Sequence, residues 1–219
     1  RDPEMSRGLG DVYKRQLQAS PRATAQYLND VFNSVLLKDV VSRNNIRDTE
    51  LLNRIIQFIF DNVGSTFSAK NISDFLKSQG RKLGVETTYN YLDYLENAFV
   101  IERVKRFDLK GKKYLETQEK IYAADVGIRN SVLGYRPSDI AGILENLLYL
   151  NLRQKGFRVS VGKMGTLEVD FVASKDEEVL YVQVCYQLTP ENLEREIAPL
   201  KQIKDNYPKL VLTLSDLMT

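Results

Sequence analysis

Two short segments decide the fold prediction for the C-terminal part of the chain: Leu167-Glu168-Val169-Asp170-Phe171-Val172-Ala173 and Leu180-Tyr181-Val182-Gln183-Val184-Cys185-Tyr186. Both are short, rich in β-branched and aromatic residues, and alternate as strands do. Alternation predicts Glu168 and Asp170 on one face of the first strand, with the other face formed by Leu167, Val169, Phe171 and Ala173. In the second strand, Gln183 and Cys185 share a face. An acid on one strand and a polar-x-polar pair on the next are typical of a metal-dependent nuclease core.

The surrounding sequence predicts one α/β unit over residues 139–219. A helix begins at Asp139, and strands are expected at Arg158–Gly162, Leu167–Ala173 and Val179–Cys185. A charged helix from Glu191 to about Lys204 and a strand at Lys209–Thr213 complete the pattern. The order helix, three strands, helix, strand favours a mixed sheet with helices packed on it.

The preceding part of the chain is mainly helical. Apolar residues at helical spacing run from Thr24 to about Val41, and further helices are predicted after Asp48 or Thr49, after Ser68, and over Glu86–Asn97. Extended segments are expected at Phe99–Phe107, from Tyr114, and at Lys120–Ala124. Three helices followed by a hairpin are the layout of a winged helix, predicted here over residues 48–134. Residues 17–47 would form a helical linker.

The first sixteen residues, Arg1–Gln16, mix charges, glycines and single apolar residues without a period. We interpret them as a cloning or assembly remnant and leave them out of the fold prediction. The alternative is a native disordered tail.

Basic residues concentrate in the predicted hairpin. Between residues 103 and 113 there is one acid, Asp108, and there are six basic residues: Arg103, Lys105, Arg106, Lys110, Lys112 and Lys113. Nearby candidates for contacts with double-stranded DNA are Lys82, Thr87, Thr88 and Tyr89, at and before the last helix of the predicted winged helix. The alternative is a solvated edge strand whose lysines prevent aggregation.

Composition excludes several kinds of site. The 219 residues contain no His and one Cys, which excludes Ser-His triads, Cys-His dyads and His-ligated zinc within this chain. No phosphate-cradling Gly-x-x-x-x-Gly-Lys-Ser/Thr string occurs. The single Cys favours a reducing, cytoplasmic setting, and no apolar run is long enough for a membrane span. What remains is hard-cation chemistry on carboxylates, or no chemistry.

The candidate site combines Glu145 and Asp170. Glu145 falls within an apolar helical stripe, so its carboxylate needs a partner. That partner could be a Mg²⁺ ion shared with Asp170, or Arg129, Arg153 or a backbone amide. Gln183 offers only a neutral carbonyl oxygen, and Cys185 is a poor ligand for a hard cation and has no His to activate it as a nucleophile. We therefore expect no cation beside the two acids and no catalysis.

The chain resembles the C-terminal half of a large prokaryotic family of predicted AAA-type P-loop ATPases. The resemblance covers about Thr24 to Thr219 and is carried by Leu36-Leu37-Lys38-Asp39-Val40, Tyr91-Leu92-Asp93-Tyr94-Leu95-Glu96, Glu116-Thr117-Gln118-Glu119-Lys120-Ile121-Tyr122, Asp125-Val126-Gly127-Ile128-Arg129-Asn130, Leu144-Glu145-Asn146, Glu168-Val169-Asp170-Phe171, and Glu194-Arg195-Glu196-Ile197-Ala198-Pro199-Leu200 with Ile203-Lys204-Asp205-Asn206-Tyr207-Pro208-Lys209.

The resemblance implies an ATPase module upstream of Thr24, which alone would bind ATP, then a winged helix and a restriction-endonuclease-like domain. Glu145 would take the place of the helix acid and Asp170 that of the strand acid. Gln183 and Cys185 would occupy the acid-x-lysine positions, so the nuclease motif is degenerate.

Three hypotheses follow for function. The first is a non-catalytic regulatory region that binds DNA or its own upstream ATPase module. The second is a nuclease that uses Mg²⁺ or Mn²⁺ held by Glu145 and Asp170. The third is a protein-interaction or assembly module.

Overall fold

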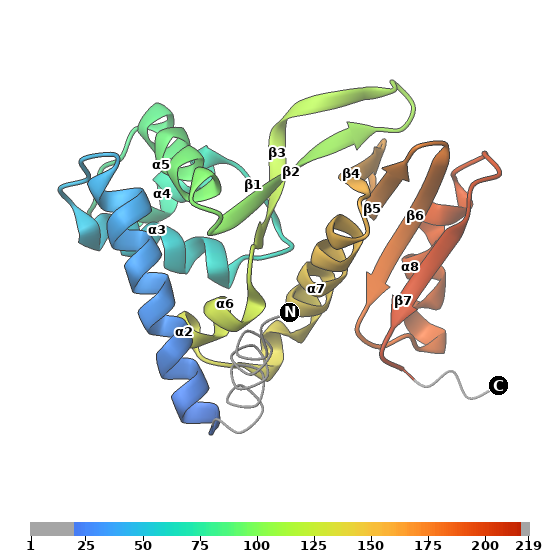
Figure 1. Ribbon diagram of the computed structural model, residues 1–219. Helices are drawn as coiled ribbons and strands as arrows, with labels where there is room; N and C mark the ends of the chain where they lie inside the picture. Colours follow the sequence, from blue (N-terminus) through green and yellow to red (C-terminus); the bar gives the residue numbers. More distant parts are fainter. Residues whose placement is uncertain (1–19, 216–219) are drawn as a thin grey trace, which may run out of the picture.

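A computed structural model describes residues 20–215, except for the side chains at positions 116 and 117. The interpretation of residues 1–16 therefore lies outside the described part. The fold is mixed α/β, and its centre is a seven-stranded sheet with the order β1-β3-β2-β4-β5-β6-β7 (Figure 1). Among the described helices, none is both long enough and apolar enough to cross a membrane.

The first half is helical, as predicted. Helix α2 (Pro21–Val35) continues as a π-helical segment (Leu36–Ser42), and α3 (Thr49–Asp61) follows with Asp48 as its N-cap. Helices α4 (Ala69–Ser78) and α5 (Val85–Asn97) come next, and Ser68 and Asn71 form a capping box on α4. The apolar faces of these helices share one buried core centred on Leu52, Ile56, Ile72 and Leu92.

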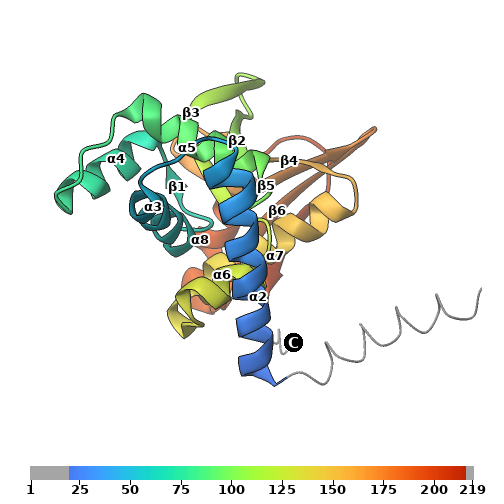
Figure 2. The same cartoon turned by 60° about the vertical axis from the view of Figure 1, so that its left-hand side comes forward.

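Strands β1 (Thr66–Phe67), β2 (Ile101–Asp108) and β3 (Lys113–Ala123) form the next part of the sheet. Two extended segments had been predicted from Tyr114 onward, but they are one strand, and its irregularity coincides with the left-handed backbone of Gln118 (φ 64°). Helix α6 (Val126–Leu133), which was not predicted, begins at the N-cap Asp125 and lies alongside α2 (Figures 1 and 2).

The C-terminal half follows the predicted order. It consists of α7 (Ile140–Gln154), β4 (Arg158–Met164), β5 (Leu167–Lys175), β6 (Glu178–Cys185), α8 (Pro190–Lys201) and β7 (Lys209–Thr213). Strands β4, β5 and β6 are antiparallel neighbours, and β7 pairs parallel to β6. Helices α7 and α8 cover opposite faces of these strands (Figure 1).

The predicted alternation along β5 is wrong beyond Asp170, because the strand contains a bulge. The register against β4 moves from Gly162↔Val169 to Ser160↔Val172, so β5 uses one residue more than its partner. Val169 consequently packs in the core beneath α8, whereas Phe171 packs in the core beneath α7. The bulge thus brings Asp170 and Phe171 to the same side of the sheet.

The sheet joins the two halves of the chain through a short contact. Strand β2 pairs in parallel with β4 over Arg106–Asp108, and a register shift between Val104 and Arg106 separates this contact from the rest of β2. The part of β2 that pairs with the end of β3, Ile101–Val104, has no pairing with β4. Residues of β3 can therefore face α7 and β5, although β2 and β4 lie between β3 and β5 in the strand order.

Candidate functional site

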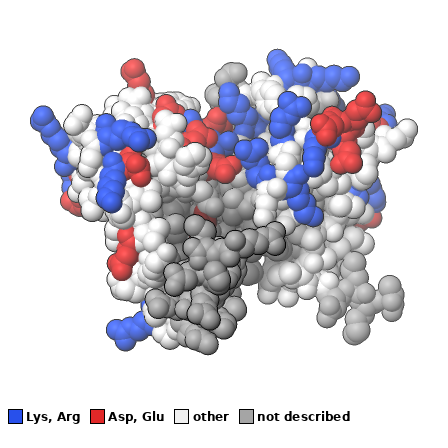
Figure 3. Space-filling view, in the orientation of Figure 1, with Lys and Arg blue, Asp and Glu red and all other residues white. Residues whose placement is uncertain are grey.

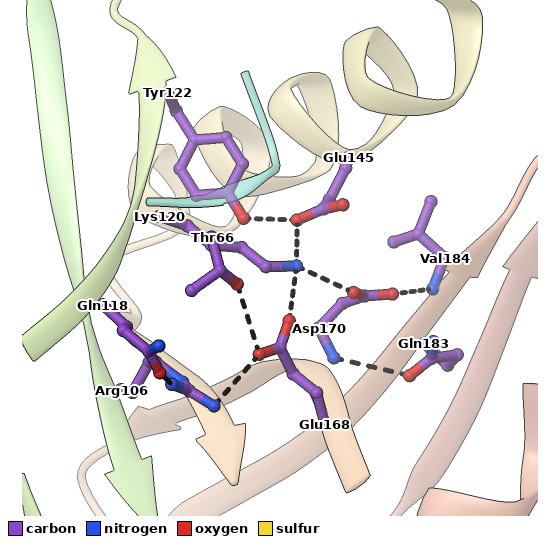
Figure 4. Close-up of polar contacts among 10 residues, drawn as sticks. All are labelled: Thr66, Arg106, Gln118, Lys120, Tyr122, Glu145, Glu168, Asp170, Gln183 and Val184. Atoms are coloured by element: carbon purple, nitrogen blue, oxygen red, sulfur yellow. Dashed lines mark hydrogen bonds and ion pairs between the residues drawn. The ribbon is translucent and has the colours of Figure 1, made fainter. Parts of the chain in front are cut away.

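The centre of the candidate site is the ammonium group of Lys120, which the sequence prediction had not included. Its Nζ lies 2.9 Å from Glu145 Oε1, 3.1 Å from Glu168 Oε1 and 3.1 Å from Asp170 Oδ1 (Figure 4). The lysine comes from β3, Glu145 from α7, and the other two acids from β5. Because only 5% of the Lys120 side chain is exposed, these are buried ion pairs.

This arrangement corrects two predictions. We expected no cation beside Glu145 and Asp170, but Lys120 lies between them. We also expected Glu145 to pair with a metal, Arg129, Arg153 or a backbone amide. Its partners are Lys120 and the hydroxyl of Tyr122, which donates to Glu145 Oε1.

Packing holds the two β3 residues in place. Lys120 and Tyr122 are two residues apart, so their side chains lie on the same side of β3, toward α7 (Figure 4). The Tyr122 ring stacks on Tyr149 of α7, with centroids 4.6 Å apart and planes 16° apart, and also packs against Phe171. One turn before Tyr149 on α7, Asn146 bonds both the backbone N–H and the carbonyl of Ala123. The end of β3 is thus fixed to the helix that carries Glu145.

The backbone of β6 holds Asp170. The Val184 N–H donates to Asp170 Oδ2 at 2.9 Å, and the Asp170 N–H donates to Gln183 Oε1 at 3.4 Å. Gln183 thus lies next to the acid as expected, but its carbonyl oxygen is already an acceptor for the backbone. One carboxylate oxygen of Asp170 thus accepts from the Lys120 ammonium, and the other accepts from the backbone of β6.

Glu168 connects the cluster to a second buried cation, Arg106. Glu168 Oε2 lies 3.5 Å from Arg106 Nη2 and accepts from the Thr66 hydroxyl at 3.4 Å. The Arg106 guanidinium also donates to Gln118 Oε1, while its Nε is buried without a partner. The cluster therefore contains three carboxylates, one ammonium and one guanidinium.

Burial and charge act in opposite directions on these groups. Burial alone would lower the pKa of Lys120, but the carboxylates of Glu145, Asp170 and Glu168 outweigh it and raise that pKa above its ordinary value. Burial raises the pKa of Glu145 to about 7, although the Lys120 ammonium opposes the shift. Burial, together with the Glu145 carboxylate, raises the pKa of Tyr122 well above its ordinary range. Lys120 and Tyr122 thus both stay protonated and act as donors to Glu145.

A pocket of about 380 Å³ opens beside the cluster. Glu145, Asp170 and Gln183 line it together with Gly64 and Gly142. Gly142 permits the close approach of α7, because a β-carbon there would lie 2.7 Å from the carbonyl oxygen of Val63. The acids therefore face Lys120 on one side and an accessible space on the other.

The donor set does not fit the Mg²⁺ ion that the sequence offered as a possible shared partner of Glu145 and Asp170. In the described part of the chain, no three His, Cys, Asp or Glu side chains converge closely enough to hold a metal ion. Lys120 occupies the position between the carboxylates, and its Nζ–O distances of 2.9 to 3.1 Å exceed the roughly 2.1 Å of Mg²⁺–O bonds. We therefore derive no metal-dependent step at this site.

Cys185 lies apart from the acid cluster. Its thiol is buried and donates to the Gln187 carbonyl at 2.9 Å, close to Asn192 on α8. Burial raises the pKa of this thiol, which favours the unreactive protonated form. The structure therefore does not bring Cys185 together with Glu145, Asp170 and Gln183.

Three of the predicted nucleic-acid contacts are engaged inside the protein. Arg103 is tied to Asp93 and Glu96 of α5, and Arg106 is held by Glu168 and Gln118. Thr88 is fully buried, and its hydroxyl donates to the Gly84 carbonyl within α5. These three side chains are not available to DNA, because ion pairs or helix packing already occupy them.

The remaining basic candidates lie on the surface. Lys82, Lys105, Lys110, Lys112 and Lys113 are exposed, as are Thr87 and Tyr89, and none of the five lysines is ion-paired with a side chain that the structure describes. Figure 3 shows Lys and Arg side chains gathered over the region where the β2–β3 hairpin lies in Figure 1.

The sequence held a partial signal for Lys120. Lys120 directly precedes the apolar end of its strand, Ile121-Tyr122-Ala123, and shares a strand face with Tyr122, which is compatible with a buried charge that needs a carboxylate partner. The identity of that partner depends on where β3 lies relative to β5, and local pattern does not specify this distant arrangement.

Comparisons with known proteins place the chain in a family. It is 39% identical over 186 residues to an uncharacterized protein of Haemophilus influenzae, which covers 85% of this chain and 46% of that protein. It is 31% identical over 200 residues to an uncharacterized protein of Methanocaldococcus jannaschii, and this match covers 87% of the chain and 44% of that protein. The chain thus spans less than half the length of these relatives, and no solved structure matches it. Residues 13–139 match a family described as "Domain of unknown function (DUF8612)", so the chain belongs to that family.

Proposed function

We propose that this chain is a non-catalytic regulatory and DNA-binding region of a P-loop ATPase, with a winged helix followed by a degenerate restriction-endonuclease-like domain. The ATPase module would precede Thr24. The fact that the chain covers less than half of its relatives supports a region of a longer protein.

The element order supports the winged-helix part. Helices α3, α4 and α5 pack around one core and lead directly into the β2–β3 hairpin, with the short strand β1 pairing against β3. In winged helices, the last helix enters the major groove and the hairpin contacts phosphates. Here α5 presents Thr87 and Tyr89 on its exposed first turns.

Two features support a degenerate nuclease-like part. The order α7, β4, β5, β6, α8, β7 gives three antiparallel strands and a parallel fourth between two helices. The acids Glu145 and Asp170 are ion-paired to Lys120, and β6 has Gln183 and Cys185 at the two positions where the nuclease motif would have an acid and a lysine. This arrangement favours a structural role for the acids over phosphodiester cleavage.

The observation that carries the DNA-binding proposal is the group of exposed lysines on the hairpin, for which the described side chains offer no ion pair. Lys105, Lys110, Lys112 and Lys113 are exposed, and Lys82 precedes α5. Lysines without an ion pair to any described acid are available to neutralise phosphates, with release of counterions.

We expect a labelled 20-base-pair duplex to bind in an anisotropy titration at about 50 mM salt and to dissociate as salt rises. Replacing Lys110, Lys112 and Lys113 with alanine should weaken binding at least about tenfold and reduce the log–log salt slope by about three. The matched control replaces Lys38, Lys77 and Lys155, which are exposed elsewhere. Equal losses in the two variants, or no binding by the wild type at low salt, would contradict the proposal.

A second candidate function is docking to a protein, most simply to the upstream ATPase module. Phe99 is 82% exposed and has a left-handed backbone (φ 54°), an unfavourable conformation for an aromatic residue. It borders a mainly apolar pocket of about 180 Å³ that Phe32, Val35 and Ile128 also line. An exposed aromatic next to an apolar pocket is typical of a contact site.

Docking predicts a selective effect in the full-length protein. Phe99→Ser should change the ATP hydrolysis rate and expose the junction near Thr24 to limited proteolysis, while Tyr135→Ser, at another exposed aromatic residue, should change neither. Unchanged hydrolysis and cleavage in Phe99→Ser would exclude this contact.

A further inference from the structure

We propose that the Lys120 ammonium substitutes for a divalent cation, so that the wild-type protein does not bind Mg²⁺ or Mn²⁺ at this cluster and loss of Lys120 opens a divalent-cation site. The inference depends on the geometry of the cluster and is independent of DNA binding by the hairpin.

The hydrogen-bonding geometry is that of an ammonium ion. Lysine has three N–H donors, and Lys120 has three carboxylate oxygens within 2.9 to 3.1 Å, one each from Glu145, Glu168 and Asp170. Distances in this range are normal for N–H···O bonds. The contacts to Glu145 and Asp170 are hydrogen bonds, and the contact to Glu168 is an ion pair. In the described part of the chain these carboxylates do not converge closely enough to hold a small metal ion.

The remaining oxygens limit metal binding in the wild type. Asp170 Oδ2 is an acceptor for Val184 N–H, Gln183 Oε1 is an acceptor for Asp170 N–H, and Glu168 Oε2 faces Arg106 and Thr66. A metal ion would have to displace an ammonium that three carboxylates hold. The 3.4 Å contact of Gln183 is weak enough to break if a metal took the place of Lys120.

Removing Lys120 increases the excess of negative charge in the cluster. Two largely buried carboxylates, Glu145 and Asp170, and the partly exposed Glu168 would remain. Of these three acids, Arg106 pairs with Glu168, and no described cation other than Lys120 pairs with Glu145 or Asp170. Buried carboxylates without a counter-charge either take up protons or bind a cation. The 380 Å³ pocket lined by Glu145, Asp170 and Gln183 offers a hydrated Mn²⁺ ion access from the side opposite Lys120. Shortening the lysine to alanine also provides the space in which the carboxylates can approach the ion.

The test uses Mn²⁺ as the probe with wild type, Lys120→Ala and Lys120→Gln. Binding is followed by the loss of the free-Mn²⁺ electron paramagnetic resonance signal, and stability by thermal unfolding. With Mn²⁺ at about 100 times its dissociation constant, Tm of the two variants should rise by about 5–10 °C, whereas the wild type should show neither binding nor a shift. Adding Asp170→Asn to Lys120→Ala should remove the effect.

Each possible result of the Mn²⁺ titration either supports or overturns the inference. Mn²⁺ binding by the wild type that Asp170→Asn abolishes would overturn the inference, because the ammonium would then not exclude the metal. If Lys120→Ala does not fold without metal, recovery of its circular dichroism spectrum in millimolar Mn²⁺ supports the inference. If neither variant binds Mn²⁺ or gains stability from it, the cluster is only an ion-pair network and the inference is wrong.

Discussion

Lys120→Met is expected to lower the free energy of unfolding by about 3–5 kcal/mol, which is the usual cost of removing one partner from a buried charge cluster. The side chain is 5% exposed and holds three carboxylates, two of which are also largely buried. Methionine keeps much of the side-chain volume and removes the charge. The loss of stability is therefore due mainly to carboxylates left without a counter-charge, and only in small part to a cavity. The change in the free energy of unfolding is measured by urea unfolding at neutral pH with a chelator present.

The control for this prediction is Lys105→Met, on the neighbouring strand. Lys105 is exposed, so its replacement should change stability by no more than about 0.5 kcal/mol. A second check is the pair Lys120→Met with Glu145→Gln. Because Glu145 then carries no charge, the double variant should be less destabilised than the sum of the single changes. A loss below about 1 kcal/mol for Lys120→Met would show that solvent already screens the cluster.

The same cluster shows where sequence reasoning succeeds and where it stops. Local signals were sufficient for most helices, although α6 was missed: Asp48 caps α3, and Ser68 caps α4 as expected. They were also sufficient to identify Glu145 as a buried acid that needs a partner. The identity of the partner was missed, because Lys120 lies on β3, 25 residues before Glu145 in the chain, and only the tertiary packing of α7 and β5 against β3 brings them together.

Two other errors have specific physical causes. The bulge in β5 moves Phe171 to the side of Asp170, and strict alternation cannot predict an extra residue whose position is set by pairing with β4. On the hairpin, six basic residues looked equivalent in the sequence. Only the fold shows that Arg103 and Arg106 are paired with acids of α5 and β5. Counting charges therefore overestimated the surface available to phosphates.

A second large effect is expected at Arg129, which connects the two halves of the chain. Arg129 is 1% exposed; its Nε donates to the Phe60 carbonyl at 3.0 Å and its Nη2 to Asp139. Phe60 belongs to α3 and Asp139 immediately precedes α7, so a single guanidinium ties the helical half to the helix that carries Glu145. Asp139 also accepts from Arg136, whose guanidinium reaches Asp61.

We expect Arg129→Met to cost about 3–5 kcal/mol, because it leaves a largely buried carboxylate and a buried carbonyl without their donors. Arg136→Met should cost less than about 1 kcal/mol, since that side chain is 45% exposed and solvent replaces its contacts. Equal effects of the two substitutions, measured by urea unfolding at neutral pH, would show that burial does not control the strength of this network.

The Asp139 carboxyl adds a pH dependence with a definite sign. The hydrogen bond from Arg129 lowers the pKa of Asp139 to about 2, with a smaller contribution from Arg136.

A pKa that folding lowers from an ordinary value near 3.9 stabilises the protein at higher pH, and this stability is lost as pH falls toward 2. A shift of about two units corresponds to about 2–3 kcal/mol before screening, and solvent screening near the surface lowers this to about 1–2 kcal/mol. Asp139→Asn should therefore lose about that amount at pH 7, and the difference from wild type should shrink as the pH is lowered from 5 to about 2. A difference that stayed constant over this range would mean that the arginine is held by the shape of the site and that the charge of Asp139 contributes little.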